Sequence, residues 1–220
     1  MYVSHRYKLI FLRSPKTASS SLSEFFIKNI PDPSAIYTPV EDSNILGTLD
    51  GNIVKKYIKD FKYYHLTIED LIRENIVTEQ QARTYKVISV LRDPVDRQKS
   101  FFYFYAKWKA RGKPVDLALY KRLAPNGTFR DEPNSSLVQS DFSKLGKEYI
   151  GQYWLYENIN KCISDLMQEL SLVITHPLPN HKSNFRKNKG DEIVFDAHCL
   201  DQLKTVFKKD FELYNGLKGI

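Results

Sequence analysis

Cysteine is scarce in this chain, which has only Cys162 and Cys199 among its 220 residues. These two residues form no CxxC pair, so they give neither a disulfide framework nor a cysteine-based zinc site. We expect both to be small buried apolar residues. The chain also lacks any run of about 18 apolar residues, and its start lacks the apolar core of a secretory signal peptide. We therefore expect no membrane span and a cytoplasmic location.

Glycine is absent from residues 13–21, a stretch that joins two patterns of different period. The apolar run at 9–12 precedes it and is typical of a buried strand. Apolar residues at helical spacing follow it, at Leu22, Phe25, Phe26 and Ile30. The stretch is therefore expected at a helix N-terminus, where backbone N–H groups and the helix dipole attract a phosphate or sulfate.

Lysine and hydroxyl side chains take the place of glycine in this loop. Lys16 adds a positive charge, and hydroxyl donors follow at Thr17, Ser19, Ser20 and Ser21. Without the glycines of the Gly-x-x-x-x-Gly-Lys-Ser/Thr loop, a Mg-ATP site is disfavoured. Two interpretations stay open at this point: an anion cradle, or a simple helix cap beside a solvated lysine.

Acidic residues are fewer than basic ones, 26 against 33, which gives a formal net charge of +7. This excess favours an anionic ligand, an acidic polymer or a nucleic acid without choosing between them. The content of 42% hydrophobic and 27% charged residues is ordinary for a globular protein. We expect a single domain over residues 1–220, with irregular insertions at about 35–60 and 109–147.

Strand patterns alternate with helix patterns along the chain. Strands are expected at 9–12, 61–65, 85–91 and 172–175, and helices at about 22–30, 67–76, 95–108, 147–170 and 196–214. This alternation predicts an α/β fold with a central parallel sheet flanked by helices. In such a sheet, ligands bind where strands turn into helices at one edge. Lys16, His65 and Arg92 occupy three of these turns.

Two helix starts are marked by capping residues. Thr67-x-x-Asp70 resembles a capping box. Asp93 is a good N-cap residue, and Pro94 suits the first helical position because its missing N–H costs nothing there. For Arg97, one turn later, two roles stay open: binding a ligand, or neutralising an aspartate on the same helix.

Two of these turns resemble the motifs of sulfotransferases that use 3′-phosphoadenosine 5′-phosphosulfate, especially the carbohydrate-type branch. Residues 11–22, with Pro-Lys-Thr at their centre, are similar to the family's loop for the 5′-phosphosulfate. Residues 90–103 are similar to its 3′-phosphate signature, Arg-x-Pro-x-x-Arg-x-x-Ser-x-Tyr, and the spacing from Arg92 to Ser100 agrees with it. Weaker similarity covers 64–67, near the family's catalytic histidine, and 178–183, a late loop that closes on the nucleotide. The resemblance implies a P-loop-like nucleotide-binding sulfotransferase fold.

The chain departs from this family at two places. It has Ala-Ser-Ser where relatives commonly carry a glycine-containing loop, and Asn-His-Lys-Ser where they more often show His-x-Asn-Lys-Ser.

The resemblance also implies roles for particular residues. The donor would be bound by Arg13, Ser14, Lys16, Thr17, Ala18, Ser19, Ser20, Ser21, Arg92, Ser100, Lys182 and Ser183. Lys16 would stabilise the leaving 5′-phosphate, and His65 would take the proton of an acceptor hydroxyl. The alternative base is Glu41 or Asp42, chosen only from their position in the irregular insertion. The resemblance implies a carbohydrate acceptor, and a small metabolite, a lipid or a peptide tyrosine stays open as an alternative. We expect no metal, because Lys and Arg can stabilise the leaving-group charge.

The aromatic residues Tyr103, Tyr105 and Trp108 allow two interpretations: they hold a sugar, or they pack the helix on the core. Two other function classes also stay open. A kinase-like ATP-dependent transferase would need a metal-binding acid at a strand end, where this chain has Arg92 and His65 instead. A non-enzymatic polyanion-binding module would suit the charge, but the positive residues are dispersed and no nucleic-acid motif is present. We therefore expect no specific nucleic-acid partner.

Overall fold

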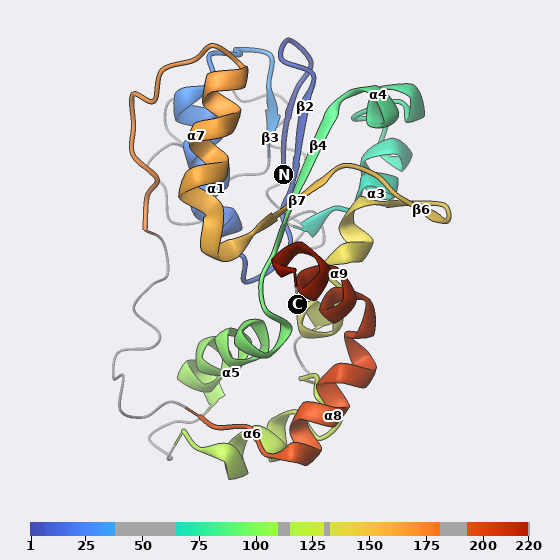
Figure 1. Ribbon diagram of the computed structural model, residues 1–220, viewed down its shortest axis with the longest axis vertical. Helices are drawn as coiled ribbons and strands as arrows, with labels where there is room; N and C mark the ends of the chain where they lie inside the picture. The colour runs from blue at the N-terminus through green and yellow to red at the C-terminus, as the bar shows by residue number, and fades with distance from the viewer. Residues whose placement is uncertain (38–64, 110–114, 130–132, 181–192, 220) are drawn as a thin grey trace. The chain divides into compact units, whose positions relative to one another are not determined.

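The computed structural model describes residues 1–37, 65–109, 115–129, 133–180 and 193–219 (Figure 1). The chain divides into two compact units. The first unit comprises Met1–Leu91 and Ser140–His181, and the second comprises Arg92–Gln139 and Lys182–Ile220. The prediction of a single domain is not tested by this division and stays a prediction.

A five-stranded mixed sheet forms the centre of the first unit, in the order β3-β1-β2-β4-β7. Its strands are β1 (Tyr2–Ser4), β2 (Leu9–Leu12), β3 (Ile36–Tyr37), β4 (Lys86–Leu91) and β7 (Gln152–Leu155). The α/β class is confirmed, and β2, β4 and β7 are parallel as expected. The prediction is wrong for β1, which pairs antiparallel with β2 and β3. The turn at residues 5–8 is short enough for a hairpin, whereas a parallel pair needs a long crossover.

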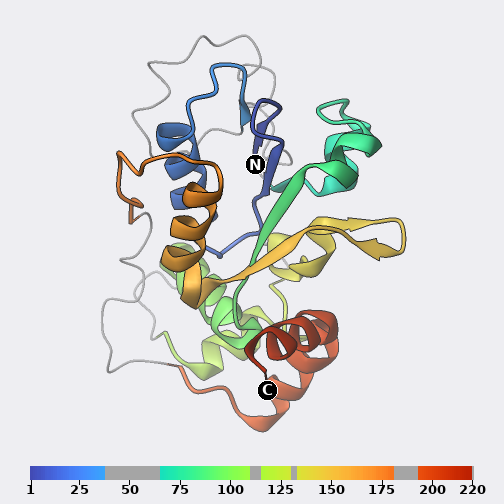
Figure 2. The same cartoon turned by 45° about the horizontal axis from the view of Figure 1, so that its top comes forward.

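Two helices, α1 (Ser19–Asn29) and α7 (Ile159–Glu169), lie side by side along the sheet (Figures 1 and 2). Phe26 of α1 connects them to the strands, because its ring lies 5.1 Å from that of Phe11 and 6.3 Å from that of Trp154. Ile163 and Met167 of α7 belong to the same buried cluster. Burying such side chains stabilises the fold by about 1.5–3 kcal/mol each. This cluster is the core that supports the residue 13–18 loop.

Two short helices, α3 (Ile68–Arg73) and α4 (Glu79–Thr84), lie on the other side of β4 from α1 and α7 in both views (Figures 1 and 2). The predicted capping box at the start of α3 is confirmed. The Thr67 hydroxyl accepts a hydrogen bond from the Asp70 N–H, and the Asp70 carboxylate accepts one from the Thr67 N–H at 2.8 Å. A second capping box starts α4 at Thr78.

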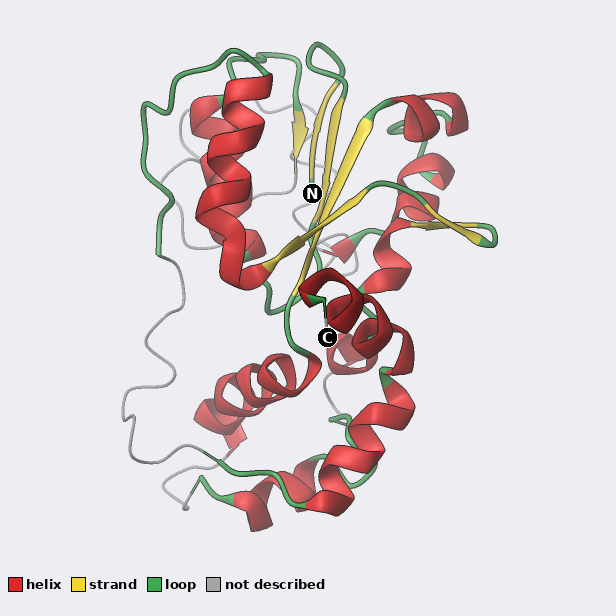
Figure 3. Cartoon of the chain, viewed as in Figure 1, coloured by secondary structure: helices red, strands yellow, loops and turns green. Residues whose placement is uncertain are grey.

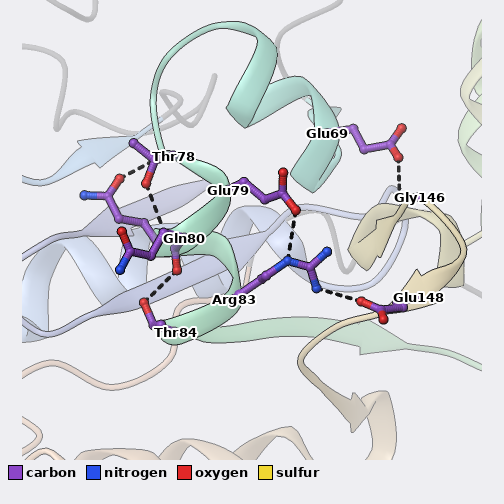
Figure 4. A network of polar contacts seen from close by, with 9 residues as sticks. Glu69, Thr78, Glu79, Gln80, Arg83, Thr84, Gly146 and Glu148 are labelled. Atoms are coloured by element: carbon purple, nitrogen blue, oxygen red, sulfur yellow. Dashed lines mark hydrogen bonds and ion pairs between the residues drawn. The ribbon is translucent and has the colours of Figure 1, made fainter.

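A small hairpin of β5 (Lys144–Leu145) and β6 (Glu148–Tyr149) lies against these helices. Figure 4 shows the contacts: Arg83 donates to Glu79 at 3.0 Å and to Glu148 at 2.6 Å, and Glu69 accepts from the Gly146 N–H at 2.8 Å. These side chains are largely exposed, so each ion pair contributes only about 0–1 kcal/mol. They set the position of the hairpin more than they stabilise the unit.

The second unit is mainly helical (Figure 3). Its elements are α5 (Pro94–Lys109), α6 (Leu117–Leu123), the 3₁₀ helix η3 (Pro133–Ser136), α8 (Ala197–Val206) and α9 (Lys208–Lys218). Aromatic rings form its core, with Tyr120 at 5.5 Å from Phe102 and at 4.4 Å from Phe195. The predicted cap at the start of α5 is confirmed, because the Asp93 carboxylate accepts from the Asp96 N–H at 2.8 Å.

Several predicted boundaries are wrong. The helix expected over 147–170 begins only at Ile159, after β6, β7 and the 3₁₀ helix η5 (Tyr156–Asn158). The strand expected at 172–175 has no regular structure, and Val173 is 79% exposed. The helix expected over 196–214 is two helices, separated at Phe207.

Other predicted segments lie partly or wholly outside the described residues. Of the strand expected at 61–65, only His65 is described, in a short helical turn before α3. The insertion expected at 35–60 is described only as far as Tyr37. The insertion expected at 109–147 contains α6, η3, the 3₁₀ helix η4 (Ser140–Ser143) and β5. Among the helices described here, none is both long and apolar enough to cross a membrane.

Gly151, directly before β7, offers a test of how closely β7 packs on β4. A Cβ atom at this position would lie 2.5 Å from the carbonyl oxygen of Val87, and the residue has φ +96°. Gly151→Ala should therefore lower the free energy of unfolding by about 3 kcal/mol, from overpacking and backbone strain together. Gly146→Ala is the matched control, because Gly146 has φ +61° but a Cβ atom there would meet no other atom within 4 Å. Its loss should be about 1 kcal/mol in chemical denaturation; equal losses would contradict the close packing.

Candidate functional site

The loop between β2 and α1 has an unusual backbone. Lys16 and Ala18 both have positive φ angles, 65° and 57°, in the left-handed region. This conformation costs a residue other than glycine about 1–2 kcal/mol. Ala18 is the N-cap residue of α1, and its side chain makes no capping hydrogen bond. Left-handed residues in a turn help to form the concave backbone sites that bind anions, and strained residues of this kind cluster at functional sites.

Buried hydroxyl groups hold the loop against β4. The Ser14 hydroxyl donates to the carbonyl oxygen of Val90 at 3.0 Å, and the Thr17 hydroxyl donates to the carbonyl oxygen of Ser14 at 2.8 Å. Both side chains are fully buried. Ser14 and Thr17 therefore fix the shape of the loop through their hydroxyl groups.

Arg13 connects the start of the loop to the first turn of α1. Its guanidinium donates to the Ser20 hydroxyl at 3.0 Å, and the residue is only 4% exposed. Ser19 and Ser21 are buried in the same turn, whereas Lys16 and Ser20 are half-buried. The structure thus brings the sequence-predicted residues Arg13 to Ser21 together at the N-terminus of α1.

His65 also lies at this loop. Its Nδ1 is 2.7 Å from the carbonyl oxygen of Arg13. A carbonyl oxygen only accepts hydrogen bonds, so Nδ1 carries the proton and, in the neutral ring, Nε2 holds the lone pair. The contact therefore selects the tautomer in which Nε2 can act as a base. It joins the loop to the start of the segment that leads into α3.

The other predicted donor residues with a described structure lie in the second unit. Arg92 follows Leu91, the last residue of β4, and its guanidinium donates to the Asp96 carboxylate at 2.5 Å. Ser100, two turns along α5, is half-buried. The predicted residues Lys182 and Ser183, and the alternative bases Glu41 and Asp42, lie outside the described residues.

Arg97 has surroundings that the sequence did not indicate. It is fully buried, and its guanidinium lies 5.1 Å from the ring centre of Phe101 and 5.5 Å from that of Phe207. Burial lowers the pKa of Arg97 to about 10; the negative charge of Asp210 opposes this shift and the charge of Arg92 adds to it. Arg97 therefore stays protonated at neutral pH.

Two of the three aromatic candidates for sugar binding have other contacts, and the side chain of the third, Trp108, lies outside what the structure describes. Tyr105 is 7% exposed and belongs to the core of the second unit, as the packing interpretation predicted. The Tyr103 hydroxyl accepts a hydrogen bond from the Ile193 N–H at 2.9 Å.

Two buried residues of the second unit that the sequence reasoning missed are Gln139 and Asp210, both fully inaccessible to solvent. Gln139 binds the backbone of Arg92, and Asp210 binds that of Gln139. Neither residue lies in a motif or in a periodic pattern, so no local signal could have found them.

Comparison with protein-family models, with curated proteins and with solved structures found no match to this chain. Within the described part of the chain, no group of three or more His, Cys, Asp or Glu residues is placed to hold a metal ion.

The strain at Ala18 can be tested by substitution. Ala18→Gly should raise the free energy of unfolding by about 0.5–1 kcal/mol, because relief of the left-handed strain exceeds the extra entropy of the unfolded chain. The control is Ala82→Gly inside α4, a buried position with helical geometry, which should lower stability by about 1 kcal/mol. Chemical denaturation of both variants measures the difference, and a loss of stability in Ala18→Gly would contradict the strained backbone.

Proposed function

We propose that this protein is a sulfotransferase that moves a sulfuryl group from 3′-phosphoadenosine 5′-phosphosulfate to an acceptor hydroxyl. The contact between His65 and the carbonyl oxygen of Arg13, at 2.7 Å, is the observation that carries the proposal. This hydrogen bond holds the candidate base His65 next to the loop that carries Lys16, at the N-terminus of α1. It also selects the tautomer that a base needs. A simple helix cap would give no reason for a histidine held in this way.

The 5′-phosphosulfate end of the donor is assigned to the residue 13–21 loop. Lys16 supplies a full positive charge, and the N-terminus of α1 supplies a partial one. Lys16 and Ala18 have the left-handed backbone from which anion-binding turns are built, here without glycine. These features support binding of an anion of the size of a phosphate or sulfate.

The 3′-phosphate end of the donor is assigned to Arg92 and Ser100. The planar fork of an arginine suits a phosphate, and a serine hydroxyl can donate a further hydrogen bond. This assignment rests on the resemblance of residues 90–103 to the 3′-phosphate signature. A donor with two anionic ends requires two such groups of residues.

The proposed reaction is an in-line transfer. The acceptor oxygen forms a bond to sulfur as the bond from sulfur to the 5′-phosphate oxygen breaks, and adenosine 3′,5′-bisphosphate leaves. Nε2 of His65 takes the acceptor's proton, and Lys16 stabilises the negative charge on the departing phosphate. The carbohydrate class of the acceptor rests on the resemblance of the two motifs to the carbohydrate-type branch.

Donor binding is the first test. In calorimetry, adenosine 3′,5′-bisphosphate should bind at least about tenfold more tightly than adenosine 5′-monophosphate, because a 3′-phosphate adds charge-assisted hydrogen bonds. ATP-Mg at the same salt concentration is the comparison for a kinase-like site. A preference for ATP-Mg would contradict the proposal, and so would salt-sensitive binding of polyanions with no nucleotide dependence.

Matched variants of the first unit test the catalytic roles. Lys16→Ala should reduce turnover by roughly 10²-fold or more, and His65→Ala by roughly 10²–10⁴-fold with donor affinity unchanged. Lys8→Ala and His5→Ala are the controls, because Lys8 is exposed and His5 contacts the Tyr85 hydroxyl at 3.2 Å. Both controls should keep turnover within about twofold. Full activity in His65→Ala would remove it as the base.

A further inference from the structure

Gln139 binds both polar groups of the Arg92 backbone. The Arg92 N–H donates to Oε1 of Gln139 at 2.9 Å, and Nε2 of Gln139 donates to the Arg92 carbonyl at 2.9 Å. Residues that face each other in a hydrogen-bonded strand pair exchange the same two bonds. Arg92 comes directly after the last residue of β4. The side-chain amide of Gln139 gives its backbone the same two hydrogen bonds that a residue on a neighbouring strand would give. It fixes both the position and the orientation of the Arg92 backbone.

Asp210 of α9 holds Gln139 in turn. The Gln139 N–H donates to Oδ2 of Asp210 at 2.8 Å. Asp210 is fully buried, and its negative charge opposes the lowering of the Arg97 pKa that burial causes, so the two opposite charges stabilise each other. Removing one member of such a pair leaves a buried charge without compensation and is strongly destabilising. The buried carboxylate of Asp210 therefore has a fixed position within the second unit, and its hydrogen bond fixes the backbone of Gln139.

The side chain of Arg92 is oriented separately from its backbone. Its Nε donates to Asp96, one turn into α5. With the backbone held by Gln139 and the guanidinium by Asp96, the arginine is constrained at both ends. A guanidinium group that binds a phosphate through two hydrogen bonds must be held within about 0.5 Å of its binding geometry.

We infer that Gln139, held by Asp210, is a positioning residue for the binding of the donor's 3′-phosphate by Arg92. This inference rests on the proposed function and extends it to the part of the protein that sets the specificity for a 3′-phosphate. A purely structural role would instead make Gln139 a buried amide that only satisfies the backbone hydrogen bonds of Arg92. The two roles differ in one measurable quantity, the preference for nucleotides that carry a 3′-phosphate.

The experiment uses the full chain and compares two buried glutamines. Gln139→Met keeps the approximate side-chain size but removes both hydrogen bonds to Arg92. Gln98→Met is the matched control, because Gln98 is also fully buried in the second unit and its Nε2 donates to the Ser135 carbonyl at 2.8 Å. Calorimetry gives the Kd of each variant for adenosine 3′,5′-bisphosphate and for adenosine 5′-monophosphate.

In Gln139→Met, the Kd for adenosine 3′,5′-bisphosphate should rise by about tenfold, while the Kd for adenosine 5′-monophosphate stays unchanged. The ratio of the 5′-monophosphate Kd to the bisphosphate Kd should therefore fall by about tenfold, because a displaced Arg92 loses its charge-assisted hydrogen bonds to the 3′-phosphate. Gln98→Met should keep the wild-type ratio. An unchanged ratio in Gln139→Met, or equal weakening of both nucleotides, would overturn the inference while the proposed function stands. A wild-type protein without any preference for the 3′-phosphate would overturn both.

A second variant covers the case in which Gln139→Met does not fold. In Gln139→Glu, an ionised carboxylate cannot donate to the Arg92 carbonyl, whereas the protonated acid can. The 3′-phosphate preference should therefore be reduced at pH 8 and should return toward the wild-type value at pH 5, with wild type measured at each pH. A preference that stays equal to wild type at both pH values would also overturn the inference.

Discussion

The parallel pairing of β4 with its neighbours is the constraint on which the rest of the candidate site depends. The register places Leu12, the last residue of β2, beside Ser89 of β4. Because β4 continues to Leu91, the chain that leaves β2 passes alongside the last residues of β4. Ser14 uses this proximity by binding the Val90 carbonyl. The loop is thereby fixed to the strand that leads into Arg92.

A strained loop of this kind needs a rigid support. Two left-handed residues cost about 1–2 kcal/mol each, a substantial part of the roughly 5–15 kcal/mol by which a domain is stable. The support comes from both sides of the loop. Phe11 of β2 and Phe26 of α1 are fully buried and in ring contact, so a shift of the strand or the helix that relaxed the turn would disturb this packing. We interpret the strain at Lys16 and Ala18 as maintained by this core.

The sequence predicted the elements whose signals are local. β2 and β4 are short buried apolar runs, and α3 and α5 start at capping residues that form their bonds within one turn. β7 was missed because Trp154 and Ile159 continue a helical spacing of apolar residues. The strand β7 depends instead on the close approach of Gly151 to Val87 of β4, which no local sequence pattern shows. Residues 172–175 have the composition of a strand, yet the Thr175 N–H donates to the buried Asn29 side chain at 2.8 Å instead of to another strand.

The same distinction applies to the candidate site. The loop and Arg92 were found because each belongs to a contiguous motif. Gln139 and Asp210 could not be found, because their bonds join residues 47 and 71 positions apart. The tautomer of His65 was equally out of reach, since it depends on a carbonyl 52 positions away.

The two ends of the proposed donor site depend on separate contacts. The loop, Lys16 and His65 are held by the sheet core and by the Arg13 carbonyl, whereas Arg92 is held by Gln139 and Asp96. A substitution that removes the contacts of Arg92 should therefore leave those of the loop and His65 intact, and the reverse should also hold. Under the proposed function, loss of the Gln139 contacts would weaken recognition of the 3′-phosphate while His65 keeps its contact with Arg13, and loss of His65 would slow proton transfer while Arg92 keeps its contact with Gln139. Under the proposed function this separation suits a two-ended donor, because the 3′-phosphate does not change its charge during transfer, whereas the 5′ leaving group must be stabilised as negative charge develops on it.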